Sequence, residues 1–203
     1  MERRDGTLWL SPSDLSGHLG CAHLTTLALE VSEGVRTRPS SMTAYTKMIF
    51  AKGNEHELAY RDQLIAQGRD VVEVAFEPGA WAAGAARTEE LMRAGADVIY
   101  QAPFAFSGWR GIADFLERIG EPSELGDYSY EAVDTKLARN EMLPHHALQL
   151  CFYADAIQAL TGVAPVDLKI WLGSGNVETV RLQDLHAYWR RLRRQMRRLC
   201  RLL

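Results

Sequence analysis

The sequence has few cysteines and no long apolar run, and both shortages narrow what the protein can be. Its three cysteines, Cys21, Cys151 and Cys200, are far apart and form no CxxC pair. A disulfide framework is therefore not expected, and a complete zinc or iron–sulfur ligand set is not visible. No apolar run approaches the roughly 20 residues of a membrane-spanning helix, and the first residues lack the apolar segment of a signal peptide. We expect a cytoplasmic protein that contacts no membrane.

The chain also has no internal repeat, no low-complexity linker and no Walker A sequence. Its 203 residues, 47% hydrophobic and 24% charged, suit one well-filled core. The formal net charge of −3 conceals an asymmetry, because residues 190–203 contain no acid and seven arginines: Arg190, Arg191, Arg193, Arg194, Arg197, Arg198 and Arg201. The remainder is more acidic than the whole, so any nucleic-acid groove in it must be a local basic patch.

Periodicity and turn residues predict one α/β domain. Helices are expected from Ser11 to Leu29, over 44–67, 81–92 and 144–160, and from 183 onward; the helix over 144–160 should be amphipathic. Strands are expected over 71–76, 97–105, 111–116, 130–136, 166–172 and 177–182. Gly53, in the middle of a predicted helix, indicates either close approach of another backbone or a break before Asn54. We assign residues 1–189 to the domain and 190–203 to a basic helical tail, the start of a following region if the protein is longer.

The most informative pattern lies in residues 111–136. Its two predicted strands flank a stretch rich in Gly, Pro, Ser and Asp, which indicates an antiparallel hairpin with a long loop. Because side chains alternate along a strand, Asp134 and Lys136 project from the same face. If the pairing also brings Asp114 to that face, two carboxylates and one ammonium group converge.

Such a cluster suits a hard divalent cation. Two close carboxylates repel each other unless a cation lies between them, and Mg²⁺ prefers oxygen ligands. A lysine beside the metal can orient, or help to deprotonate, a water whose pKa the metal has lowered, and that water can attack a phosphodiester. The same residues also fit an ordinary hairpin with exposed charges, and on their own they leave both interpretations open.

Beside such a cluster, His56 and the pair Gln149 and Tyr153 become candidate functional residues. His56 fits a surface position on a helix, or a third ligand to Mg²⁺ or, more comfortably, Mn²⁺. Gln149 and Tyr153 are four residues apart and share one helix face. They fit an exposed amide and a half-buried ring, or a surface that contacts a phosphate and stacks on a base.

Taken in chain order, these segments resemble the RecB-type branch of the PD-(D/E)XK nuclease superfamily. The resemblance covers most of residues 11–190 and rests on SPSDL at 11–15 with Cys21, GNEHE at 53–57, GIAD at 111–114, EAVDTK at 131–136 and QLCFY at 149–153. It is nearest to RecB-like nucleases that form the N-terminal domain of longer proteins, often ahead of an RNase H-like or helicase region. It implies a restriction-endonuclease-like α/β core, with a mixed β-sheet flanked by helices.

The resemblance also implies the roles of individual residues. The ligands of a Mg²⁺ or Mn²⁺ ion would be the side chains of His56, Asp114 and Asp134 and the carbonyl of Thr135. Lys136 would be the catalytic lysine, acting with Asp114 and Asp134. Gln149 and Tyr153 would contact the DNA strand near the scissile phosphate.

The function expected on these grounds is hydrolysis of DNA phosphodiester bonds, with single strands or ends favoured, in repair, recombination or defence. The alternative is a catalytically weak module that binds nucleic acid and positions it for a fused helicase or RNase H-like domain; the presence of both aspartates and the lysine disfavours it. RNA cleavage stays open. Some relatives hold an iron–sulfur cluster on one early and three late cysteines, but Cys200 is the only cysteine after the last motif, so a cluster is not supported.

Overall fold

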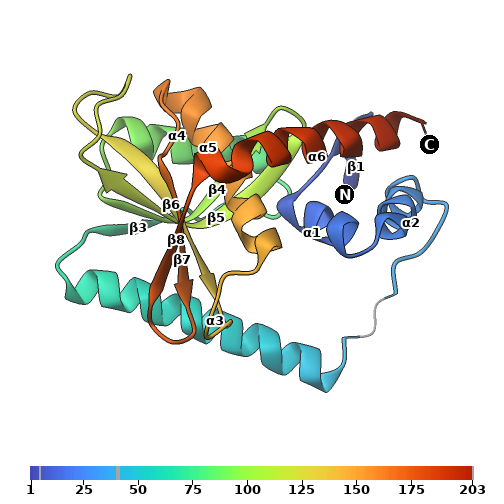
Figure 1. Cartoon of the computed structure of the whole chain (residues 1–203), viewed down its shortest axis with the longest axis horizontal. Coiled ribbons are helices and arrows are strands. Elements are labelled where there is room, and N and C mark those ends of the chain that lie inside the picture. Colours follow the sequence, from blue (N-terminus) through green and yellow to red (C-terminus); the bar gives the residue numbers. More distant parts are fainter. Residues whose placement is uncertain (5, 40–41, 203) are drawn as a thin grey trace.

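The computed structural model describes residues 1–4, 6–39 and 42–202 (Figure 1). Its helices are α1 (Pro12–Gly20), α2 (Ala22–Ser32), α3 (Ala44–Ala66), α4 (Trp81–Arg93), α5 (Pro144–Thr161) and α6 (Leu182–Leu202). Its strands are β1 (Glu2–Arg4), β2 (Thr7–Trp9), β3 (Val71–Glu73), β4 (Val98–Phe106), β5 (Trp109–Ile119), β6 (Ser129–Lys136), β7 (Asp167–Leu172) and β8 (Val177–Arg181). The small pair formed by β1 and β2 was not predicted.

One mixed sheet contains the strands from β3 to β8 in chain order. The pairs β3–β4 and β6–β7 are parallel, whereas β4–β5, β5–β6 and β7–β8 are antiparallel. The predicted hairpin with a long loop is therefore β5 and β6, at the middle of the sheet. The expected α/β class, with a mixed sheet flanked by helices, is confirmed.

Helices cover both faces of this sheet. Along one face runs α3, which lies apart from the other helices in Figure 1 and packs Tyr60 and Leu64 against a cluster that includes Phe115 and Trp171. The opposite face carries α4, α5 and α6 and the larger core. Apolar side chains on both faces explain why the central strands read as nearly continuous hydrophobic runs.

The innermost helix, α5, is buried on almost every side, so the prediction that it is amphipathic was wrong. Leu150, Cys151 and Ile157 have no exposed surface, and Leu148, Phe152 and Ala154 have very little. The sheet covers one side of α5 while α1 and α6 pack on others, so only Pro144 at its start and Gln158 and Ala159 near its end are exposed. It ends at Gly162 with φ +74, as the sequence predicted. Even so, no helix among the described residues is both long and apolar enough to cross a membrane.

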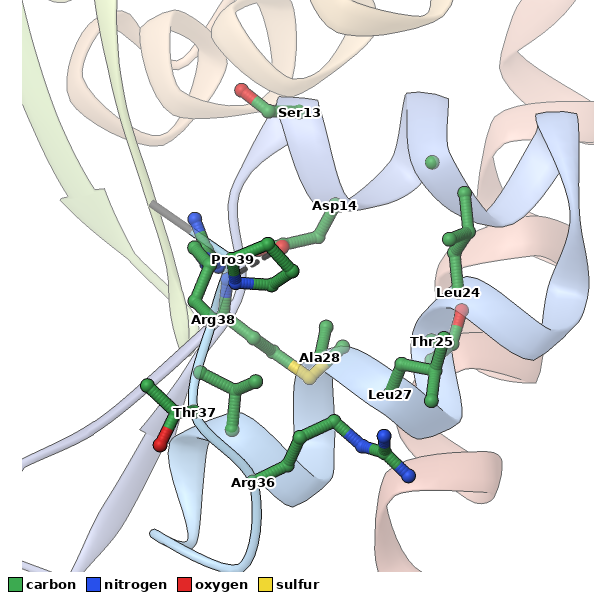
Figure 2. Close-up of a pocket in the computed structure, with 13 residues that line it drawn as sticks. Ser13, Asp14, Leu24, Thr25, Leu27, Ala28, Arg36, Thr37, Arg38 and Pro39 are labelled. Carbon is green, nitrogen blue, oxygen red and sulfur yellow. Dashed lines mark hydrogen bonds and ion pairs between the residues drawn. The ribbon is translucent and has the colours of Figure 1, made fainter. Parts of the chain in front are cut away.

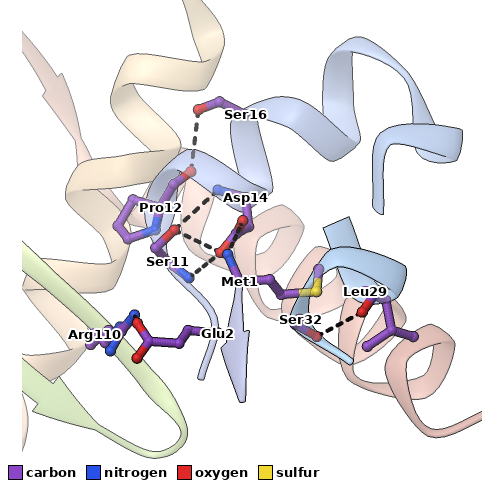
Figure 3. Close-up of polar contacts among 9 residues, drawn as sticks. All are labelled: Met1, Glu2, Ser11, Pro12, Asp14, Ser16, Leu29, Ser32 and Arg110. Atoms are coloured by element: carbon purple, nitrogen blue, oxygen red, sulfur yellow. Dashed lines mark hydrogen bonds and ion pairs between the residues drawn. The ribbon is translucent and has the colours of Figure 1, made fainter. Parts of the chain in front are cut away.

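The helix expected from Ser11 to Leu29 is two helices that separate at Cys21. The predicted start is confirmed: Ser11 and Asp14 form a reciprocal capping box, and the amino group of Met1 lies 2.5 Å from Asp14 Oδ1 (Figure 3). Cys21 has an extended backbone, with φ −162 and ψ 116, which ends α1 and begins α2. Its thiol is exposed, whereas Cys151 is buried. In the same region Glu2 pairs with Arg110 and ties β1 to β5 (Figure 3).

Gly53 does not interrupt α3, and no backbone approaches it. The helix runs unbroken from Ala44 to Ala66, and a Cβ at Gly53 would have no atom within 4 Å. Both explanations offered for this glycine from sequence are therefore wrong. Gly53 instead lies in the wall of a pocket, where the absent side chain leaves room.

The arginine-rich segment continues α6 rather than following the domain. The boundary expected between 189 and 190 falls inside this helix, and Leu192 and Met196 beyond it belong to the main core. Asp155 of α5 holds the helix in place: it accepts hydrogen bonds from Trp189 Nε1 at 2.7 Å and from Arg193 Nη1 at 2.6 Å, and contacts His186 Nε2 at 2.9 Å. At least part of the positive charge of this segment is therefore structural.

Candidate active site

At Asp114 the pairing of β5 with both of its neighbouring strands is interrupted. Between β5 and β6 the ladder ends at the pair Phe115–Val133. The next position in the same register would pair Asp114 with Asp134, which is the register that the sequence-based site requires. On its other side, β5 pairs with β4 at residues 113 and 115 but not at Asp114. Asp114 thus lies at a gap in the ladders to both neighbouring strands.

Gln101 of β4, which would face Asp114 in that ladder, has the unusual backbone that accompanies the gap. Its φ is +53, a left-handed value that residues other than glycine rarely adopt. The alternation of the strand changes there: Tyr100 packs in the cluster under α3, whereas Ala102 packs in the core under α5. The Gln101 amide donates a hydrogen bond to Glu57 Oε1 on α3. Strained backbone of this kind concentrates at functional sites.

Two donors from Thr135 fix the carboxylate of Asp114. The Thr135 backbone N–H and Oγ1 both donate to Asp114 Oδ2, at 2.8 and 2.9 Å. Because the ladder has stopped at Val133, the N–H of Thr135 turns to this carboxylate instead of continuing the β5–β6 ladder. The local loss of pairing and the fixed position of Asp114 therefore have the same cause.

Asp134 and Lys136 project from the same face of β6, as predicted. The Lys136 Nζ lies 2.5 Å from Asp134 Oδ2, and the Asp134 side chain is almost fully buried. Burial, and next the charge of Asp114, raise the pKa of Asp134 to about 7 even though Lys136 acts in the opposite direction. Burial lowers the pKa of Lys136, but the charges of Asp134 and Asp114 outweigh it and leave that pKa raised.

The donor set fits a divalent cation. Asp134 Oδ2 is buried and, among the described residues, accepts no hydrogen bond of ordinary geometry, so its 2.5 Å approach to Lys136 is an ionic contact. A desolvated carboxylate beside a second carboxylate is stabilised by a cation between them. No group of three His, Cys, Asp or Glu side chains in the described part of the chain is arranged to hold a metal. Mg²⁺, however, is often bound through one or two carboxylates and completes its shell with water and substrate phosphate.

A pocket of about 510 Å³ opens over this cluster. One wall is polar and consists of Asn54, Glu57, Asp114, Thr135 and Lys136. The other wall is largely apolar, with Ile49 and Phe50 from α3 and Leu137 and Leu143 from the segment that follows β6. The pocket therefore joins a charged centre to a surface suited to an uncharged, flat or apolar group.

Glu57 is a member of the site that the sequence analysis missed. It lines the pocket with Asp114, and burial, followed by the charge of Asp114, raises its pKa. The signal was in the spacing: Glu57 precedes the buried Tyr60 and Leu64 by three and seven residues, which places it on the inner face of α3. The resemblance to RecB-like nucleases implies its neighbour His56 as the ligand instead.

In this structure His56 faces a strand backbone rather than the pocket. Its ring stacks on Trp171 with centroids 4.1 Å apart, and its Nε2 lies 3.4 Å from the Trp171 carbonyl oxygen. Trp171 pairs with Thr135 in the parallel ladder between β6 and β7. His56 thus lies over β7, one strand away from Asp134 and two from Asp114, and its role as a ligand stays a prediction.

Gln149 and Tyr153 hold α5 to its neighbours. The Gln149 amide donates to Ser16 Oγ of α1 at 3.2 Å, and the Tyr153 hydroxyl donates to the Ile112 carbonyl of β5 at 2.5 Å. Neither residue lines the pocket over the aspartates. Tyr153 is buried, and burial raises its pKa well above the usual value, followed by the charges of Asp134 and Asp114. It supports the site from behind, while DNA contact by either residue stays a prediction.

His146, at the start of α5, also lines the pocket and was not singled out from the sequence. Its side chain is buried, and burial, with the neighbouring charges of His145 and Lys136, lowers its pKa to about 4. It is therefore neutral at physiological pH. A neutral imidazole adds a polar group to the pocket without further repulsion of Lys136.

A second cavity, of about 440 Å³, lies between α1, α2 and residues 36–39 (Figure 2). Its lining is mostly apolar, with Leu24 and Leu27 among its walls. The carboxylate in it, Asp14, is already bound by the Met1 amino group and by Ser11. We assign the chemistry to the first pocket because Asp114 and Lys136 line it, and Lys136 contacts the buried Asp134.

Comparison with known proteins assigns this chain to no family. A scan against protein-family models finds no match to this chain, and a search of curated proteins finds none. The functional interpretation depends on the site itself.

Proposed function

We propose that the protein is a metal-dependent deoxyribonuclease built on a PD-(D/E)XK-like core, acting on single strands or ends of DNA. The observation that carries this proposal is the register of β5 and β6. It brings Asp114 next to Asp134 where the ladder stops, with Lys136 Nζ 2.5 Å from Asp134 Oδ2. Two carboxylates and a lysine so placed on a central hairpin match the arrangement that the resemblance to RecB-like nucleases implies. The fold alone would not support an activity.

Asp114 and Asp134 would hold Mg²⁺ or Mn²⁺, together with the Thr135 carbonyl and either His56 or Glu57. A metal bound there would lower the pKa of a water molecule and neutralise charge on the phosphate oxygens. The buried oxygen of Asp134 that lacks an ordinary hydrogen bond supports this assignment.

The chain's own groups would position the reactants. The two hydrogen bonds from Thr135 keep the Asp114 carboxylate in one orientation, so that it needs little reorganisation when substrate binds. Lys136, held beside Asp134, presents an ammonium group to the pocket and would orient the attacking water or donate to a phosphate oxygen. Buried Tyr153 behind β5 limits solvent access from the other side of the sheet.

The alternative class is a nucleic-acid-binding module without useful catalysis. The observation in its favour is that His56 stacks on Trp171 and does not line the pocket, which leaves the metal with fewer protein ligands. Such a module would bind DNA and metal but leave the strand intact, so the same assay distinguishes the two.

The test is incubation of labelled single-stranded and double-stranded DNA with the protein in Mg²⁺, in Mn²⁺ and in EDTA. Wild type should cleave only with metal, and Asp134→Ala should not cleave. Asp127→Ala, at an exposed loop position between β5 and β6, is the matched control and should keep full activity. An RNA strand of the same sequence tests whether the protein also cleaves RNA. Binding without cleavage in every metal would favour the module, and equal cleavage by Asp134→Ala would refute the site.

A further inference from the structure

The pocket over the aspartates is divided between two kinds of chemistry. Its carboxylates and Lys136 would engage a phosphate through a metal, but Ile49, Phe50, Leu137 and Leu143 have nothing to offer a phosphate. Phe50 is 58% exposed and Ile49 38% exposed, so these side chains contribute little to the core. An exposed apolar surface joined to a polar centre indicates a ligand that has both characters.

The inner face of α3 sets the distance between the two parts. Phe50, Gly53 and Glu57 follow one another at spacings of three and four residues and all line the pocket. Seven residues of helix separate Phe50 from Glu57, which is about 10 Å along the axis. Gly53 lies between them and presents no side chain, and a Cβ there would meet open space. The wall is therefore hollow where a group passing from Glu57 to Phe50 would lie.

The first half of α3 has no structural reason to be apolar. The buried residues of this helix are Tyr60 and Leu64, both in its second half. Ahead of them the helix carries exposed Lys47 and Lys52 against one acid before His56, Glu55. Lys47 is three residues from Phe50 and shares its face, whereas Lys52 projects from the opposite face of the helix. Basic side chains interleaved with an exposed aromatic ring suit a nucleic-acid strand, because the charges follow the phosphates and the ring stacks on a base.

We propose that Phe50, with Ile49 beside it, forms a stacking platform for the base of a nucleotide whose neighbouring phosphate lies at Asp114 and Asp134. This inference rests on the proposed function and adds to it a specificity-determining residue. A base can reach the ring only when it is unpaired, because in a duplex its faces are covered by its neighbours and its edge by its partner. Phe50 would therefore make the site selective for single strands or frayed ends.

A protein partner or a second copy of the chain is the competing occupant of this surface. The nucleic-acid strand is favoured because the apolar wall and the carboxylates of Glu57 and Asp114 line one pocket, and because Lys47 adds positive charge beside Phe50 on the same helix face. A protein interface would not need the exposed ring to adjoin the charged centre.

The experiment measures binding in Mg²⁺ with Lys136→Met as the background, so that the strand stays intact. Two fluorescent oligonucleotides of equal length are compared, one with normal bases and one abasic throughout, which carry the same phosphate charge. Phe50→Ala is the test variant and Phe50→Trp the conservative one. Tyr45→Ala is the matched control, because Tyr45 is an exposed aromatic of the same helix, 69% exposed, that does not line the pocket.

Phe50→Ala should weaken binding of the normal strand about 5- to 10-fold, the lower part of the range for loss of one stacked base. It should leave abasic binding unchanged, while Phe50→Trp and Tyr45→Ala bind both strands as the background does. Normal-strand affinity unaffected by Phe50→Ala, or an equal loss for both strands, would overturn the platform; if wild type still cleaves DNA, the proposed function would survive. If sedimentation shows a dimer in wild type and a monomer in Phe50→Ala, the surface is an interface between two copies of the chain, and the inference is also overturned. If wild type neither binds nor cleaves any strand, the proposed function itself fails.

Discussion

Asp114 and Asp134 follow directly on the last pair of the β5–β6 ladder, and the strand that should continue the pairing instead donates two hydrogen bonds from Thr135 to Asp114. The interruption does two things at once. It brings the carboxylates together, and it frees a backbone N–H to hold one of them. Lys136 then approaches the other carboxylate from the next outward position of the same strand. The site is thus a consequence of where a sheet ladder ends.

The first prediction concerns the stability of the metal-free protein. The pKa of Asp134 is raised from 3.8 to about 7, so the folded state keeps its proton while the unfolded chain loses it. The contribution of Asp134 to stability should therefore fall as pH rises from about 4 to 7 and level off above, which is the reverse of the usual carboxylate, while His146, whose pKa is lowered to about 4, contributes with the opposite sign. Asp134→Asn removes this dependence, and its stability relative to wild type should rise across that window by on the order of 1–4 kcal/mol.

Urea unfolding in EDTA at several pH values between 4.5 and 8 measures this difference. The change of this difference with pH is the readout, because the other titrating groups, His146 among them, are present in both proteins, whereas the Asp134 carboxyl and its ionic contact with Lys136 are present only in wild type. A difference between the two proteins that is the same at every pH would mean that Asp134 is not the titrating group.

The second prediction concerns Thr135, whose hydroxyl donates to Asp114 at 2.9 Å in a buried setting. Thr135→Val removes that donor and should destabilise the protein by about 1–2 kcal/mol. Thr135→Ser keeps the hydroxyl and is the matched control. The Val variant should also bind Mg²⁺ about 10-fold more weakly, as expected when a group that orients a ligand is lost. Calorimetric titration with Mg²⁺ checks this, and equal affinity in the Val and Ser variants would contradict it.

The third prediction contrasts two glycines. A Cβ at Gly111 would lie 3.0 Å from the Tyr153 hydroxyl and 3.1 Å from the Phe152 ring. Gly111→Ala should therefore destabilise the protein by about 1–3 kcal/mol through overpacking. Gly53→Ala has open space and lies inside a helix, so it should stabilise by about 0.5–1 kcal/mol. Chemical unfolding of both variants is the measurement, and effects of the same sign would show that the packing at one of them is described wrongly.

The fourth prediction decides between two neighbouring candidates for the further metal ligand. Glu57 lines the pocket and His56 stacks on Trp171, so Glu57→Gln should weaken Mg²⁺ binding more than His56→Asn does. Both substitutions are close in size to the residue they replace and remove one titratable group. The reverse order of affinities would mean that the imidazole leaves Trp171 when the ion binds, as the family resemblance implies.

Much of the architecture follows from local sequence. The hairpin of β5 and β6, the helix start at Ser11 and the stop at Gly162 were predicted because turn glycines, caps and alternation act over a few residues. The helix break at Cys21 was missed although Gly20 directly precedes it, because the apolar spacing continues across this glycine and an isolated glycine is also tolerated inside a helix. The burial of α5 was missed because it depends on α1 and α6 packing around it, which no local pattern encodes.

In the site, too, the features set by local sequence could be predicted and those set by tertiary packing could not. Asp134 and Lys136 share a strand face by a period of two, so their proximity could be predicted, and Asp114 followed once the hairpin register was assumed. The helical spacing of Glu57 from Tyr60 and Leu64 places it on the inner face of α3, but its contact with Gln101 could not be predicted, because it depends on a left-handed residue in β4 and on the crossing of α3 over the sheet. Gln149 and Tyr153 matched a motif, yet the structure places them against α1 and β5.

The central claim is that Asp114 and Asp134 act as one metal-binding unit in strand cleavage. Its most direct test is the cleavage rate of a labelled single-stranded oligonucleotide in Mg²⁺ by Asp114→Asn, Asp134→Asn and the double variant. Residues that act as a unit are not additive, so each single change should reduce the rate by about 100-fold or more and the double variant should be little worse than either. Single variants that cleave within about twofold of wild type would contradict the claim, since that is well below the effect of losing a group that acts in the transition state.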